Sequence, residues 1–170
     1  IYIFILAVSI FTTGCQKLVN DPGGEDPNIE VDNGLSYWGG AYDDFGHAVV
    51  QTADGGYAVV GSQYSVDTQQ DLMLVKFSST LVFESDTSFG GANSAYNNVA
   101  NDLQQTADGG YILVGTTYNA DSLDSDVWIV KYTPNLAMAW QDTIDGGNND
   151  VGQSVHQTQD GGYIVCGTSN

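Results

Sequence analysis

The chain has 170 residues, and its 21 acidic residues outnumber 3 basic ones, so the formal net charge is −18. A nucleic-acid partner is excluded because binding phosphates needs a basic surface, and no arginine is present to clamp a phosphate or carboxylate with two hydrogen bonds. Because 42% of the residues are hydrophobic and 11% aromatic, with 21 Gly and 3 Pro, the composition predicts a folded, turn-rich β protein.

The first residues have the features of an export signal. Residues 1–11, IYIFILAVSIF, form an uncharged apolar run that is shorter than the about 20 residues of a membrane-spanning helix and matches the hydrophobic region of a secretory signal. Thr12, Thr13 and Gly14 then lead to Cys15. These small residues before a cysteine resemble the lipobox of bacterial lipoproteins, which implies a signal peptide over residues 1–14 and a lipid anchor on Cys15. An ordinary signal peptide that happens to precede a cysteine is the alternative.

Residues 15–34 are polar and acidic and show no apolar periodicity. We interpret them as a flexible tether that follows the lipidated cysteine. The membrane is therefore an expected partner, through the lipid, and the expected location is the outer membrane or cell surface. An orientation facing the periplasm stays open, because Gln16 and Lys17 precede the first acid, Asp21. The chain starts without methionine or a basic segment, so we expect it to begin inside its own signal.

One motif recurs three times along the chain. QTADGGYAVVG begins at Gln51, QTADGGYILVG at Gln105 and QTQDGGYIVCG at Gln157. Each copy follows a Gly-Gly pair and an alternating apolar segment. The first two copies are followed by matching segments, DLMLVKF over 71–77 and DVWIVKY over 126–132. A period of about 50 residues indicates a repeat architecture.

The local chemistry predicts four short strands in each repeat. Asp bonds its own backbone and Gly supplies positive φ, so Asp-Gly-Gly predicts a tight hairpin. The Tyr-led runs that follow are apolar on both faces, as expected for strands covered on both sides. Cys166 aligns with Val60 and Val114, and we therefore expect it to behave as a small buried hydrophobe. No stretch between the motifs has a helical period.

Four antiparallel strands in about 50 residues are the blade of a β-propeller. A right-handed β-solenoid is the alternative, although its coils are usually shorter. The motif resembles the tandem T-x-D-G-G-Y propeller repeats of bacterial secreted and surface proteins, over about residues 36–170. The expected fold is therefore all-β, with a β-propeller of four-stranded antiparallel blades.

The number of repeats predicts an incomplete propeller. Residues 35–170 contain about two and a half blades, with repeats at about 39–90, 91–145 and 146–170, the last one truncated. Residues 35–38 are expected to be the last strand of a preceding blade. Because propellers close with about 4–8 blades, we expect the chain to be a fragment of a longer protein.

The motif residues are predicted to be structural. The Thr-x-Asp-x-Gly spacing resembles the first half of the Asp-box, a structural hairpin of sialidases, but the arginine cluster that sialidase chemistry needs is absent. The predicted turn residues are Asp54, Gly55, Gly56, Asp108, Gly109, Gly110, Asp160, Gly161 and Gly162.

Three further groups of polar residues are candidates for a role. Lys76 and Lys131 share one repeat position, and we expect each to pair with a neighbouring acid, in particular the Asp of its own blade's turn. The loop carboxylates are candidates for Ca²⁺, which binds six to eight oxygens, but they lack the spacing of a calcium loop. A solvated loop and no cofactor is the prediction, with calcium the alternative. The candidate ligands are Asp121, Asp124 and Asp126.

No catalytic constellation is visible in the sequence. His47 and His156 fall at different repeat positions, and no nucleophile elbow, phosphate-binding loop or dinucleotide fingerprint is present. The predicted function is a non-catalytic binding or scaffold module at the bacterial envelope, whose ligand is a glycan or another envelope protein. The alternative is a fragment of a propeller enzyme that acts on polysaccharide, with its catalytic residues in other blades.

Overall fold

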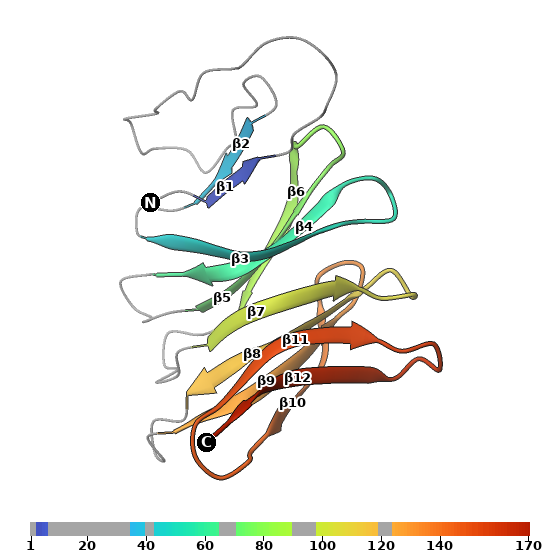
Figure 1. Ribbon diagram of the computed structural model, residues 1–170. Helices are drawn as coiled ribbons and strands as arrows, with labels where there is room; N and C mark the ends of the chain where they lie inside the picture. Colours follow the sequence, from blue (N-terminus) through green and yellow to red (C-terminus); the bar gives the residue numbers. More distant parts are fainter. Residues whose placement is uncertain (1–2, 7–34, 40–42, 65–70, 90–97, 119–123) are drawn as a thin grey trace.

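The computed structural model describes residues 3–6, 35–39, 43–64, 71–89, 98–118 and 124–170. Within these ranges the chain forms strands joined by turns and contains no helix, so the fold is all-β. The strands make two four-stranded and two two-stranded sheets, all antiparallel (Figure 1). A search of the same ranges for a helix long and apolar enough to cross a membrane found none.

The two four-stranded sheets correspond to the first two repeats, and we call them unit 1 and unit 2. Unit 1 consists of β3 (Asp44–Gln51), β4 (Tyr57–Gln63), β5 (Asp71–Phe77) and β6 (Phe83–Phe89). Unit 2 consists of β7 (Asn98–Gln105), β8 (Tyr111–Tyr118), β9 (Ser125–Tyr132) and β10 (Met138–Ile144). Unit 3 is the hairpin of β11 (Asp150–Gln157) and β12 (Tyr163–Ser169). In units 1 and 2 the order across the sheet equals the order along the chain, which confirms the predicted antiparallel four-strand pattern.

The remaining sheet joins two segments that lie far apart in the sequence. β1 (Ile3–Leu6) pairs antiparallel with β2 (Leu35–Trp38), and Ile3 lies opposite Trp38. The sequence predicts that β1 belongs to an export signal and that β2 is the last strand of a blade. Trp38 packs against the face of unit 1 that points away from unit 2. The predicted tether and Cys15 lie outside the described residues.

The apolar core lies between neighbouring units, because successive side chains of a strand point to opposite faces. In unit 1, Val60 belongs to the cluster shared with unit 2, whereas Val59 belongs to the cluster on the other face. The pattern repeats one unit later. Leu113 packs toward unit 1, and Val114 packs with Val155 of β11. Each unit therefore completes its core only by contact with the next.

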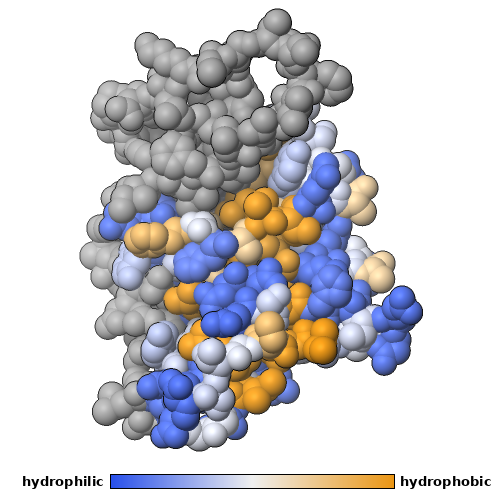
Figure 2. Space-filling model, in the orientation of Figure 1, coloured by the Kyte–Doolittle hydropathy of each residue, from blue (hydrophilic) through white to orange (hydrophobic). Residues whose placement is uncertain are grey.

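The second strand of unit 3 is covered on one face alone. Val165 packs into the cluster shared with unit 2, whereas Ile164 is 62% exposed and Cys166 is also exposed. The prediction that Cys166 is buried is therefore wrong. Its counterparts Val60 and Val114 are covered by the following unit, and no described residue covers the same face of β12. On the face shown in Figure 2, apolar side chains reach the surface among polar ones.

The first strand of every unit carries a bulge at the same repeat position. The register shifts after Gly46 in β3, after Ala100 in β7 and after Gly152 in β11. The bulge brings the first strand close to its neighbour. A Cβ added at Gly61 would lie 1.9 Å from the carbonyl oxygen of Phe45. This close approach explains why each Tyr-led run ends in glycine.

Candidate functional site

The repeated Thr-x-Asp-Gly-Gly motif forms the tight turn between the first two strands of each unit. In unit 1 the Thr52 amide donates to the carbonyl of Gly56 at 2.9 Å, and the Gly55 amide donates to the carbonyl of Thr52 at 2.9 Å. Gly55 has φ of 85°, which favours glycine. A Cβ at Gly56 would lie 2.4 Å from the carbonyl oxygen of Phe77. The two glycines are thus needed for different reasons, one for its φ and one for space.

The aspartate of the turn holds the loop together from inside. Asp54 Oδ1 accepts a hydrogen bond from the Thr52 hydroxyl and another from the Gly56 amide, the latter at 3.1 Å. These donors, with Lys76, lower the pKa of Asp54. The same contacts recur around Asp108 and Asp160 in the other two turns.

Each lysine of the repeats lies against the aspartate of its own unit's turn. Lys76 Nζ lies 2.9 Å from Asp54 Oδ2, and it also lies 3.0 Å from Glu84 Oε2. Lys131 Nζ lies 3.0 Å from Asp108 Oδ2 and donates to the carbonyl of Tyr132 at 2.9 Å. Both lysines reach back from the third strand to the turn before the second strand, so each fixes that turn to the sheet.

The two lysine sites differ in solvent access. The side chain of Lys131 is 6% exposed, whereas that of Lys76 is 20% exposed. The carboxylates that they contact remain open to water. The Thr106 hydroxyl, the Gly110 amide and Lys131 lower the pKa of Asp108 to about 2.

A second set of polar contacts crosses from one unit to the next. Gln105 Oε1 accepts from the Ala53 amide at 2.7 Å, and Gln157 Oε1 accepts from the Ala107 amide at 2.8 Å. The two contacts are the same contact one repeat apart. Asp102 adds a contact between units 2 and 3, because its Oδ2 accepts a hydrogen bond from the Val155 amide at 3.0 Å. These side chains therefore fix the stacking of the units.

The bulge residues also contribute to the contact between units. Asn101 Nδ2 donates to the carbonyl of Gly152 in unit 3 at 2.8 Å. His47 occupies the same repeat position in unit 1. Its pKa is lowered by burial, an effect partly offset by a hydrogen bond with Asn101. In units 1 and 2 the bulge thus directs a polar side chain toward the following unit.

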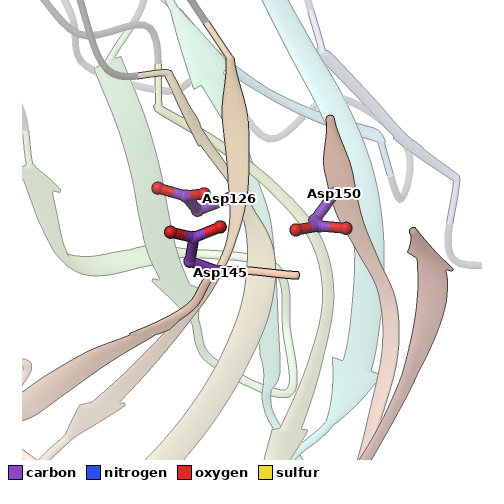
Figure 3. Close-up of side chains that lie close together, drawn as sticks. All are labelled: Asp126, Asp145 and Asp150. Atoms are coloured by element: carbon purple, nitrogen blue, oxygen red, sulfur yellow. The ribbon is translucent and has the colours of Figure 1, made fainter. Parts of the chain in front are cut away.

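Three carboxylates converge where unit 2 meets unit 3 (Figure 3). Asp126 lies near the start of β9, Asp145 directly follows β10, and Asp150 begins β11. One carboxylate oxygen from each lies within 4.8 Å of the others. Burial, and then the negative charges of Asp145, Asp124 and Asp150, raise the pKa of Asp126. The carboxylates are close enough to bind one metal ion together.

The turn between β10 and β11 holds two of these carboxylates through backbone amides. Gly146 donates to Asp150 Oδ2 at 2.5 Å, and Gly147 donates to Asp145 Oδ1 at 2.7 Å. A Cβ at Gly146 would lie 2.9 Å from each Asp150 oxygen. A larger residue at position 146 would have to displace the Asp150 carboxylate from this contact.

The cluster overlaps the calcium candidates of the sequence in one residue. Asp126 belongs to both sets, Asp124 precedes β9 outside the cluster, and Asp121 lies outside the described residues. Sequence reasoning missed Asp145 and Asp150. The signal that could have found Asp145 is an insertion, because the second fourth-strand segment has one more residue before its Gly-Gly pair than the first.

Comparison with known proteins gives this chain no family. No protein-family model matches it. No curated protein matches it either.

Proposed function

We propose that the chain is part of an exported, lipid-anchored β-propeller that acts as a non-catalytic binding or scaffold module at the bacterial envelope. The observation that carries the proposal is the uncovered face of β12. In units 1 and 2 the equivalent face is covered by the following unit. Ile164 and Cys166 hold the same repeat positions in β12, and both are exposed. A stack of equivalent units that presents the same docking face at its open side is suited to continue as propeller blades.

The use of polar side chains supports a scaffold. The aspartates of the turns, the two paired lysines and the glutamines between units all make contacts that hold the backbone in place. These contacts recur at equal repeat positions, as expected for groups that maintain a repeated structure. A module of this kind presents its loops and edges to a ligand, for which we propose a glycan or another envelope protein.

Lipidation on Cys15 has a structural consequence. Cleavage before Cys15 removes β1, which is the strand that pairs with β2. In the anchored protein β2 would then have an edge free to pair with another strand.

The lipid anchor is tested by exchanging each cysteine for serine in the complete precursor, expressed in a Gram-negative bacterium. Cys15→Ser should abolish incorporation of a clickable palmitate analogue and move the protein out of the membrane fraction. Cys166→Ser is the matched control and should keep both, since Cys166 is exposed and distant in sequence from the lipobox. Equal labelling of the wild type and Cys15→Ser would refute the anchor.

The non-catalytic role is tested with the complete protein on an array of bacterial surface polysaccharides. We expect binding without change of the glycan, as judged by chromatography of the recovered polysaccharide. Release of shorter saccharides that requires the protein would refute the scaffold role and favour the polysaccharide-degrading alternative.

A further inference from the structure

The boundary between unit 2 and unit 3 contains a group of acids that the scaffold contacts do not explain. Asp126, Asp145 and Asp150 come from three segments, and one oxygen of each lies within 4.8 Å of the others. We propose that these three carboxylates form a calcium site that joins unit 2 to unit 3. The site is distinct from the binding role proposed above, because its ligand is an ion held between two units.

The buried member of the cluster supplies the evidence that a ligand belongs there. Asp150 is 2% exposed, and its Oδ1 has no hydrogen-bond partner. In Figure 3 the carboxylate of Asp150 faces those of Asp126 and Asp145. A buried carboxylate oxygen without a donor is unfavourable, and two further negative charges beside it add repulsion. A cation between the three groups would remove both costs.

The chemistry of the donors favours Ca²⁺. All three ligands are carboxylates, which hard cations prefer, and Ca²⁺ accepts six to eight oxygens in irregular geometry. Two oxygens bound to one Ca²⁺ at about 2.4 Å can be no more than about 4.8 Å apart, which is the limit that the cluster meets. Asp126 and Asp145 keep contact with solvent, so water can complete the coordination and the ion has a path of entry.

In the described part of the chain, no lysine lies close enough to neutralise the three carboxylates. Lys76 and Lys131 are paired with the turn aspartates at the other end of their strands. Lys131 is five residues along β9 from Asp126, which corresponds to about 17 Å in an extended strand.

The boundary between units 1 and 2 provides an internal comparison. Asp71 occupies the repeat position of Asp126, and Asn98 occupies that of Asp150. Asn98 is 3% exposed. The repeat therefore accepts an amide at this buried position, which makes Asp150→Asn a substitution that the fold has already accommodated one unit earlier.

The test uses the complete chain, freed of metal with a chelator and then titrated with CaCl₂ or MgCl₂. The heat of binding is measured by calorimetry. The midpoint of thermal unfolding is measured at metal concentrations up to about 1 mM, which lies within the range of dissociation constants of extracellular calcium modules. We expect the wild type to bind Ca²⁺ and to unfold at a higher temperature with Ca²⁺ than with equal Mg²⁺.

Two amide variants locate the effect. Asp150→Asn should lose at least about tenfold in Ca²⁺ affinity, because affinity depends on the number of charged ligands. Without metal it should unfold at the same temperature as the wild type or higher, since one repulsive charge is gone. Asp142→Asn removes a charge from exposed β10, outside the cluster, and should bind Ca²⁺ like the wild type.

Three results would overturn the proposal. The first is that the wild type shows no heat of Ca²⁺ binding and no Ca²⁺-dependent change in its unfolding temperature. The second is that Mg²⁺ raises the unfolding temperature as much as Ca²⁺ does. The third is that Asp150→Asn and Asp142→Asn respond equally to Ca²⁺. The last two would reduce the effect to screening of a highly acidic chain.

Discussion

Units 2 and 3 share one motif but differ in what covers it. Strand β8 lies between two apolar clusters, one shared with unit 1 and the other with unit 3. Strand β12 has the same alternation, yet only one of its faces is covered, and the side chains of that face are only partly buried. Ile112 is 0% exposed in β8, and Ile164, at the same repeat position of β12, is 62% exposed. Whether a strand belongs to the core is therefore decided by the neighbouring unit, because the strand sequences are nearly the same.

The largest expected effect comes from truncating this matched pair of isoleucines. Ile112→Ala removes fully buried methylene and methyl groups and should lower the free energy of unfolding by about 2–5 kcal/mol. Ile164→Ala removes exposed groups and should stay within about 0.5 kcal/mol of the wild type. Denaturant unfolding of both variants of the complete chain, followed by circular dichroism, measures the difference.

A similar cost for both isoleucine variants would contradict the comparison. It would mean that the face of β12 is covered in solution, for instance by association of chains. Sedimentation of the wild type and of Ile164→Ala distinguishes that case, since association through this face should weaken when the side chain is shortened.

The lysines allow the same comparison between units 1 and 2. Lys131→Met removes a buried ammonium group that donates to Asp108 and to the carbonyl of Tyr132, and we expect a loss of about 1–3 kcal/mol. Lys76→Met should cost less, because the ion pair of Lys76 is more open to water and is screened by it. Unfolding at low and high salt checks both points.

The salt dependence of the stability loss is the control for the comparison of the two lysine variants. The smaller effect of Lys76→Met should decline further at high salt. The loss in Lys131→Met should persist, because part of it is the hydrogen bond that the buried ammonium group donates to the carbonyl of Tyr132. Equal losses at both salt concentrations in the two variants would show that solvent access does not separate the two sites.

Much of the fold could be predicted from the sequence because local chemistry specifies it. The turn forms through the conformational preferences and hydrogen bonds of its own residues, Asp54, Gly55 and Gly56. It then fixes the register of the strands on either side. In-register alignment also placed Lys76 at the position of Lys131. Such features need only the repeat itself.

Features that depend on contact between units were not predictable in the same way. The exposure of Cys166 follows from the absence of a described neighbour on one face of β12, which no property of the strand reveals. The carboxylate cluster needs an inserted residue, Asp145, to meet Asp126 and Asp150 from other segments. Its members are separated along the chain, and only the folded turn brings their oxygens together.

The smallest expected effect is on stability at acidic pH, where the turn of unit 2 is compared with that of unit 3. The pKa of Asp108 falls from 3.8 to about 2 in the folded chain, through the Thr106 hydroxyl first, then the Gly110 amide and Lys131. Because the folded state lowers this pKa, the ionised carboxylate contributes stability above pH 3.8. That stability is lost as the pH falls toward about 2.

Asp108→Asn should therefore flatten the fall of unfolding free energy over this acid range. The amide keeps an acceptor for the same donors but has no proton to take up, and at neutral pH the variant should be less stable than the wild type. Asp160 also has a lowered pKa, from Thr158 and Gly162, but no lysine contributes to it. Asp160→Asn should flatten the curve less, and a change equal to that of Asp108→Asn would show that Lys131 adds nothing to the acid stability of its turn.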